Sequence, residues 1–242
     1  TSGGVRMGSG SQLTISEDDA YALAREIPSI QASAPTLRSN GQVVFGNSNW
    51  ATQIFGITPD YLEARQWEVV SGQPVDQSQV DSAAKVVLLG QTVARALFGD
   101  ADPVGETVRI RRVPHTVVGV LDRKGQSMIG QDQDDVVLIP ILTARKRVLG
   151  GTNVKTRNVQ NITVRVRDGA DIAATEQEMR DLLRQRHKLQ SGQEDDFFIR
   201  NLSEVLAAQE ASSKILALLL AAIASVSLVV GGIGIMNMML VS

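Results

Sequence analysis

The stretch ILALLLAAIASVSLVVGGIGIMNMMLV, from Ile215 to Val241, decides how the rest of this chain is interpreted, because it contains no charged residue. As a helix, its 27 residues would be roughly 40 Å long, more than the roughly 30 Å hydrocarbon core of a bilayer requires. A secretory signal is shorter and stands at the start of a chain, whereas this stretch closes the sequence. A buried helix of a soluble domain is the alternative, but the rest of the chain offers too little apolar surface to surround it. We therefore expect a transmembrane helix over 215–241.

Small residues gather in the second half of this expected span. Ser227 and Gly231 form a small-xxx-small pair, and Gly232 and Gly234 add further bare backbone. Such residues let a second membrane helix approach closely, so these four are candidate helix-packing residues. The alternative is glycine that is merely tolerated in a membrane helix.

The remaining residues, 1–214, carry all 24 Lys and Arg and all 26 Asp and Glu, as expected for a water-soluble domain. The net charge of −2 with interspersed signs argues against a nucleic-acid partner, which needs a clustered basic face. With no cysteine, no disulfide can form, and the redox compartment stays open. The sequence begins without Met and stops directly after the apolar stretch, from which we expect it to be part of a longer protein.

Local signals predict a series of short elements. Ser16 with Asp19 predicts a capped helix that Pro28 ends. Asn40-Gly41 predicts a hairpin turn between a strand over 30–37 and the apolar run over 43–45. Further expected elements are strands over 52–57, 85–89, 106–111, 115–121, 136–139, 161–167 and 197–201, and helices over 91–98, 143–149 and 171–188.

The order of these elements predicts an α+β domain of two lobes, followed by the transmembrane helix. A β-α-β lobe would be built from both ends of the domain, and a mixed α/β lobe would be inserted between them. The expected boundaries are a flexible linker over 1–12, the first lobe over 13–56 and 158–202, the inserted lobe over 57–157, and a rigid stalk helix over 203–214.

Candidate catalytic chemistry is sparse. His115 and His187 are the only histidines, so no zinc cluster can be assembled from His and Cys. No Gly-Lys pair occurs, which excludes a P-loop. We interpret His115 as structural rather than as part of a catalytic triad, and His187 as complementing the dipole of its helix. The loop acids Asp132, Asp134, Asp135, Glu194, Asp195 and Asp196 could in principle bind calcium, but solvated loop acids are the simpler interpretation.

Several segments together carry a family resemblance. GGIGIMNMMLVS (Gly231 to Ser242), VVLLGQTVARALFGDADPVGETVRI (Val86 to Ile110), HTVVGVL (His115 to Leu121) and GQDQDDVVLIPI (Gly130 to Ile141) resemble, in order and spacing, the macrolide exporter (MacB) family of ABC transporter permeases. The resemblance covers nearly the whole chain. No single motif in it is catalytic, so its specificity lies in the ordered set.

The resemblance implies a periplasmic domain attached to the inner membrane, and a role in transmitting ATP-driven motion for export. It implies no enzyme activity and no cofactor in this chain, with ATP and Mg bound by an ABC ATPase domain or subunit. The implied partners are that ATPase, a second permease copy in a homodimer, a membrane-fusion adaptor, an outer-membrane channel and the lipid bilayer. The alternatives are an FtsX-like regulatory permease, a lipoprotein-releasing permease, and a membrane-anchored enzyme that uses His115.

Overall fold

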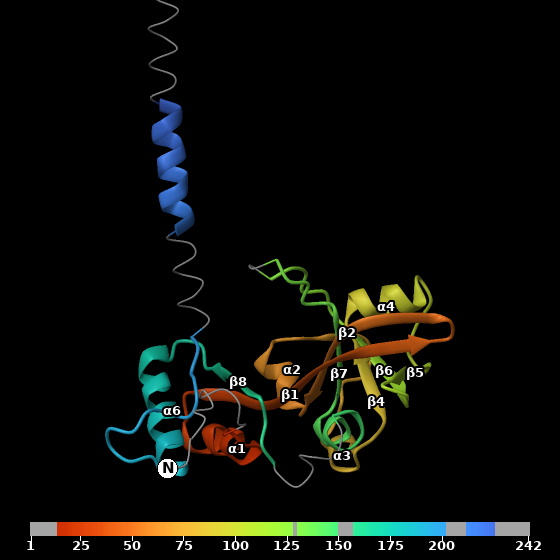
Figure 1. Ribbon diagram of the computed structural model, residues 1–242, viewed down its shortest axis with the longest axis horizontal. Helices are drawn as coiled ribbons and strands as arrows, with labels where there is room; N and C mark the ends of the chain where they lie inside the picture. The colour runs from red at the N-terminus through yellow and green to blue at the C-terminus, as the bar shows by residue number, and fades with distance from the viewer. Residues whose placement is uncertain (1–13, 128–129, 150–156, 202–211, 226–242) are drawn as a thin grey trace, which may run out of the picture. The chain divides into compact units, whose positions relative to one another are not determined.

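The computed structural model of the protein describes residues 14–127, 130–149, 157–201 and 212–225 (Figure 1). The chain forms two compact units, Thr1–Phe197 and Phe198–Ser242. The helices of the first unit are α1 (Glu17–Glu26), α2 (Asp60–Ala64), α3 (Gln77–Asp81), α4 (Gln91–Phe98), α5 (Ile141–Thr143), the π-helix η1 (Ala144–Val148) and α6 (Ile172–Arg186). Its strands are β1 (Ile30–Phe45), β2 (Ser48–Ile57), β3 (Val69–Gly72), β4 (Val86–Leu89), β5 (Thr107–Ile110), β6 (Val113–Leu121), β7 (Val136–Pro140) and β8 (Asn161–Val166).

The long strand β1 connects two groups of elements in the first unit (Figure 1). Its first half pairs antiparallel with β8, with Thr36 opposite Asn161. Its second half pairs with β2 and β5, with Val43 opposite both Trp50 and Ile110. One strand therefore takes part in both pairings, and α1 and α6 lie at the β8 end of it.

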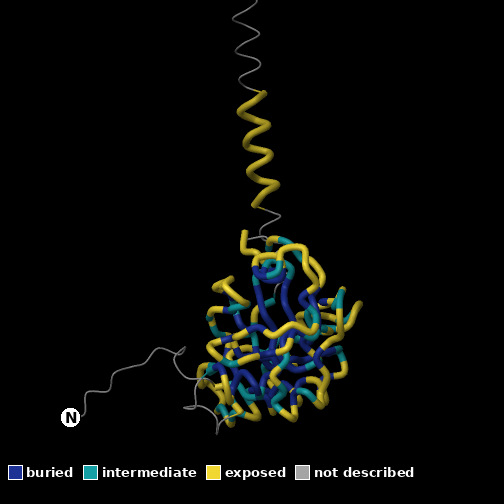
Figure 2. The backbone as a smooth tube through the Cα atoms, turned by 90° about the vertical axis from the view of Figure 1, so that its right-hand side faces the viewer, coloured by how far each residue is buried: buried dark blue, intermediate teal, exposed yellow. Residues whose placement is uncertain are grey.

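The second group of strands forms a mixed sheet that is buried on both faces. Its order is β2-β7-β4-β6-β5-β1, with β3 added beside β6, and β2–β7 and β4–β6 are parallel pairs. Successive strand residues point to opposite faces, so Leu88 and Leu89 of β4 join different apolar clusters. Helix α4 adds Val93 and Leu97 to the cluster that contains Leu89, whereas Trp67 belongs to the other. The buried backbone runs through the middle of this unit (Figure 2).

Elements that depend on local signals agree with the sequence-based predictions. Ser16 and Asp19 form a reciprocal capping box, and α1 ends at Glu26, before Pro28. The predicted pair of strands is the antiparallel hairpin β5–β6. Its turn residues, Arg111 and Arg112, both have positive φ, as a two-residue turn of type I′ requires.

The predicted hairpin turn at Asn40-Gly41 is wrong, because β1 runs unbroken through both residues and the chain reverses at Gly46. Gly41 instead serves close packing: a Cβ there would lie 2.7 Å from Cδ1 of Ile54 and 3.3 Å from Nε of Arg111. The glycine therefore lets neighbouring side chains pass close to the strand. At Gly46, φ is +55°, a conformation that glycine adopts at low cost.

Two other expected elements also differ. The helix predicted over 143–149 is a short α5 followed by the π-helix Ala144–Val148. The strand predicted over 197–201 is wrong, because none of these residues is in a strand. Phe197 is buried instead, with its ring edge-on to the His187 ring at 5.8 Å. The C-terminal part of the first unit therefore supplies a strand and a helix rather than a complete β-α-β unit.

In the second unit, the structure describes a helix over 212–225, and every one of its residues is exposed (Figure 2). Its large apolar side chains are 52% to 73% exposed, and they belong to Ile215, Leu216, Leu218, Leu219, Leu220 and Ile223. Within the described residues, no helix is both long enough and apolar enough to cross a membrane. The linker over 1–12, most of the stalk, and the candidate packing residues Ser227, Gly231, Gly232 and Gly234 lie outside the described residues.

Candidate functional site at the junction of the leading and trailing segments

Two segments that are far apart in sequence meet in the first unit. The leading segment, residues 14–16, enters α1, and the trailing segment, residues 189–197, leaves α6. The Thr14 hydroxyl donates to the Asp196 carbonyl oxygen at 2.7 Å, which joins the two segments directly. Helices α1 and α6 are also in contact. We call the cluster formed by Asp19, Arg180, Arg184, Arg186, His187, Asp195 and Asp196 the junction network.

Asp19 is the member of the network that α1 supplies. As the third residue of the helix, it accepts from the Ser16 backbone N–H at 2.9 Å, and this hydrogen bond fixes its side chain at the start of α1. Its other oxygen accepts from Arg186 Nε at 2.7 Å. Burial raises the pKa of Asp19, but the bonds from Arg186, Ser16 and His187 outweigh burial and hold this pKa below its ordinary value.

His187, at the end of α6, lies between two carboxylates. Its Nδ1 is 2.8 Å from Oδ1 of Asp196, and its Nε2 is 3.3 Å from Oδ2 of Asp19. The imidazole side chain is 9% exposed. Burial lowers the pKa of His187, but the two carboxylates favour the charged form more strongly and hold this pKa above its ordinary value. His187 therefore bridges α1 and the trailing segment, a role that its interpretation as a partner of the helix dipole did not include.

Two arginines of α6 hold the trailing segment along its length. Arg180 and Arg184 are one helical turn apart and both bond the carboxylate of Asp195, Arg180 at 2.6 Å. Arg184 also donates to the carbonyl oxygens of Gln190 at 2.8 Å and Gln193 at 2.9 Å. The trailing segment is thus fixed to α6 at several successive points.

A buried ion pair connects α1 to the π-helix. Arg145 Nη2 lies 2.5 Å from Glu17 Oε1, and both side chains are nearly fully buried, in a close ionic contact that is not aligned as a hydrogen bond. Arg157, which is half exposed, donates to the other oxygen of Glu17 at 3.1 Å and pairs with Asp18 at 3.0 Å. π-helical turns occur often at functional sites. The Glu17–Arg145 pair connects α1 to the π-helix, whose residues Ala144 and Val148 pack in an apolar cluster of the mixed sheet.

The other residues singled out from the sequence have structural partners. His115 is buried, and its Nδ1 lies 2.9 Å from the Val113 carbonyl oxygen. Burial is the main cause that lowers the pKa of His115. The bonds of the two histidines go to a carbonyl and to carboxylates, and among the described residues neither bonds a serine hydroxyl.

The interpretation of the loop acids as solvated is wrong for most of them. Asp134 is buried and accepts from the backbone N–H groups of Lys124 at 2.7 Å and Gly125 at 2.9 Å. Asp132 accepts from the Thr92 hydroxyl and Asp135 from the indole of Trp50. Asp195 and Asp196 belong to the junction network, whereas Asp132 and Glu194 are exposed as expected. In the described part of the chain, no group of three or more His, Asp or Glu is arranged to hold a metal ion.

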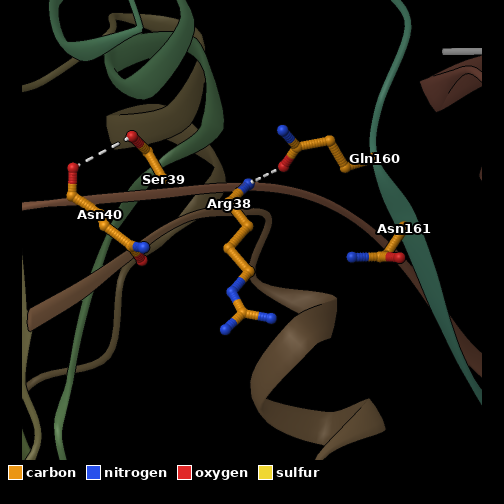
Figure 3. A pocket seen from close by; sticks show the side chains of 5 residues that line it. All are labelled: Arg38, Ser39, Asn40, Gln160 and Asn161. Carbon is orange, nitrogen blue, oxygen red and sulfur yellow. Dashed lines mark hydrogen bonds between the residues drawn. The ribbon is translucent and has the colours of Figure 1, made fainter. Parts of the chain in front are cut away.

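A small pocket of about 340 Å³ lies where β1 leaves β8 (Figure 3). Its lining is polar, and Gln160 points toward β1 and accepts from the backbone N–H of Arg38. Arg111 donates from outside to the Ser39 hydroxyl and the Asn40 carbonyl oxygen, both at 2.8 Å. These groups bond one another, so the pocket is explained by the packing of the strand junction.

Sequence reasoning missed the junction network, although one signal for it was present. Arg180, Arg184 and His187 follow one another at intervals of four and three residues, which places them on one face of a helix. The pair Asp195-Asp196 follows within reach of that face. The partner from α1, Asp19, is 168 residues from His187, and no local pattern in a single sequence connects the two.

The comparisons with known proteins agree with this fold. Residues 1–182 match the MacB-like periplasmic core domain family. The chain is 39% identical over 242 residues to the macrolide export ATP-binding/permease protein MacB of Bdellovibrio bacteriovorus, with 99% of this chain and 36% of that protein covered. It is 40% identical over 236 residues to the protein of the same name from Rhodospirillum rubrum, with 97% of this chain and 35% of that protein covered. The chain therefore spans about a third of the length of these relatives.

Two solved structures share the fold. The periplasmic region of MacB from Actinobacillus actinomycetemcomitans matches with a TM-score of 0.67 and 25% identity, covering 83% of this chain and 85% of that one. The extracellular domain of the ABC-type transporter YknZ from Gram-positive bacteria matches with a TM-score of 0.60 and 19% identity, covering 77% of this chain and 89% of that one. The second likeness is one of fold alone. With the match over residues 1–182, these results establish that the chain belongs to the MacB-like periplasmic core domain family.

Proposed function

We propose that this chain is the periplasmic domain of an ABC permease of the MacB type, together with the membrane helix that leaves it. In this role the domain transmits ATP-driven movement of the membrane helices to the periplasm. A macrolide is the first substrate to test, because the relatives from Bdellovibrio and Rhodospirillum are named as macrolide export proteins.

The observation that carries the proposal is the junction network. A domain that transmits motion must be held firmly where the chain enters and leaves it. Here the leading and trailing segments bond each other through Thr14 and Asp196, and α6 holds the trailing segment through Arg180 and Arg184. Movement of either segment is therefore passed to α1 and α6 together, and from α1 to the π-helix through the Glu17–Arg145 pair.

The exposed helix over 212–225 supports the membrane part of the proposal. Its large apolar side chains are exposed, and a contiguous exposed apolar surface of this kind marks contact with lipid or with another protein. We propose that 215–241 crosses the inner membrane and that Ser227, Gly231, Gly232 and Gly234 pack against a neighbouring membrane helix.

The proposed assembly contains an ABC ATPase that binds ATP and Mg, a second permease copy, a membrane-fusion adaptor and an outer-membrane channel. The relatives are named as ATP-binding/permease proteins, which supports the ATPase partner. An FtsX-like permease that regulates a cell-wall hydrolase is not favoured, because the relatives carry export names.

The test uses the full-length protein in cells that lack their own macrolide exporter. Arg184→Ala removes the bonds to Asp195, Gln190 and Gln193, whereas the matched control Arg25→Ala removes a pair on the exposed surface of α1. We expect Arg184→Ala to lower macrolide resistance several-fold, with ATP hydrolysis and membrane insertion retained, and Arg25→Ala to behave as the wild type.

Two other outcomes would count against different parts of the proposal. Full resistance in Arg184→Ala would mean that the junction does not transmit the motion. A wild-type protein that confers no resistance and purifies from mild detergent without an ATPase would overturn the transporter assignment. Recovery of a cell-wall hydrolase in that purification would favour the regulatory permease instead.

A further inference from the structure

The imidazole of His187 faces a carboxylate on each side. Asp196 of the trailing segment lies at Nδ1, with its two oxygens at 2.8 Å and 3.0 Å, and Asp19 of α1 lies at Nε2, at 3.3 Å. An ionised carboxylate only accepts hydrogen bonds. Both contacts are therefore favourable only when both ring nitrogens carry a proton.

A neutral imidazole carries one N–H, so one of its nitrogens must present a lone pair to a carboxylate. The loss of a proton therefore changes one of the two contacts from attractive to repulsive. Asp19 is 6% exposed and His187 is 9% exposed, so water can compensate for the lost contact only in part.

The neighbouring charges do not change in the same pH range. Besides Asp19 and Asp196, the charged groups around His187 are Arg184, Arg186 and Lys188 on its own helix end and Asp195 on the trailing segment. Arg186 forms an ion pair with Asp19 at 2.7 Å, and Arg184 forms one with Asp195. Arginine, lysine and paired carboxylates keep their charge near neutral pH, which leaves His187 as the group that switches.

We propose that His187 is a proton-operated latch that holds the trailing segment on α1 when it is charged and loosens it when it is neutral. The latch itself rests on this geometry alone. Any effect on export rests in addition on the proposed function. In the proposed periplasmic location, the domain would experience the external pH. The strength with which the trailing segment is held on α1 would then depend on that pH.

The pH range follows from the two groups. The pKa of His187 is raised above its ordinary 6.5, so the stabilisation is complete below 6.5 and is lost as the pH rises through the raised value. The pKa of Asp19 is lowered from 3.8, so its contribution is present above 3.8 and is lost only as the pH falls through the lowered value. The trailing segment is therefore held on α1 between the lowered pKa of Asp19 and the raised pKa of His187.

The first measurement is NMR of the imidazole signals of the whole chain in detergent micelles. With two histidines in the sequence, two titration curves are expected, and His187→Gln assigns them by removing one. We expect His187 to titrate above 6.5 and His115 below it. Asp196→Asn should lower the titration midpoint of His187. This variant also tests the proposal if His187→Gln fails to fold. A His187 midpoint at or below 6.5 would overturn the proposal.

The second measurement is amide hydrogen exchange of residues 189–197, corrected for the intrinsic pH dependence of exchange. Between about pH 5.5 and about pH 8.5 we expect roughly a fivefold loss of protection, the scale of one partly exposed ion pair. His187→Gln should abolish this dependence, and the matched control Lys188→Gln, next to it and exposed, should keep it. Equal protection at both pH values in the wild type would refute the latch, whether or not the protein exports macrolides.

Discussion

Removing the buried charge of Glu17 should destabilise the protein far more than removing the charge of its neighbour Asp18. In Glu17→Gln, the Arg145 guanidinium, 6% exposed, loses its carboxylate and stays buried. Loss of one partner of a buried ion pair costs about 3–5 kcal/mol. In Asp18→Asn, the lost partner is Arg157, and both side chains are 55% exposed, so the cost should be below about 1 kcal/mol. Both substitutions replace a carboxylate by an amide in the first turn of α1, so the effect of the helix dipole largely cancels.

The assay is urea unfolding of the whole chain in detergent, followed by tryptophan fluorescence. Trp50 and Trp67, the two tryptophans of the chain, lie in the first unit, so the signal reports the unfolding of that unit. The double variant Glu17→Gln with Arg145→Met should recover most of the loss, because no unpaired charge stays buried. Free energies of unfolding for Glu17→Gln and Asp18→Asn that agree within about 1 kcal/mol would show that Arg145 is not held in a desolvated pair.

Two further predictions concern the mixed sheet. In Gly90→Ala, the new Cβ would lie 2.1 Å from the Asp134 carbonyl oxygen and 3.0 Å from that of Val136; we expect a loss of about 1–3 kcal/mol in urea unfolding, and wild-type stability would contradict this close approach. Burial lowers the pKa of His115 from 6.5, so charging this imidazole destabilises the folded protein. The free energy of unfolding is therefore unaffected above pH 6.5 and falls as the pH drops from 6.5 through the lowered pKa. The stability difference between the wild type and His115→Gln should therefore shift against the wild type from about pH 7 to about pH 5, and a constant difference would show that His115 is not desolvated.

The sequence predicted well those features that depend on neighbouring residues. The capping box at Ser16 and the hairpin β5–β6 are formed by contacts over a few residues, which a single sequence displays. The same reasoning failed at Gly41, because a glycine that makes a turn and a glycine that admits Ile54 look alike in the sequence. The tertiary environment decided between them.

The candidate site was harder to predict for the same reason. The junction network depends on Asp19 and His187, which the fold brings to 3.3 Å across 168 residues. The strand predicted over 197–201 failed because burial of Phe197 against His187 replaced strand pairing. Only the spacing of Arg180, Arg184 and His187 on one helix face was visible in advance.

The shared strand β1 has a consequence for how the protein is made. As the chain is synthesised from its N-terminus, the second half of β1 can pair with β2 early, because Ser48 follows its partner Phe45 by three residues. The first half must wait, since Thr36 pairs with Asn161, 125 residues later. Until then, this part of the nascent chain exposes an unpaired strand edge that can associate with other chains. Because such late, non-local pairing is slow, completion of β8 should limit the rate at which the domain matures.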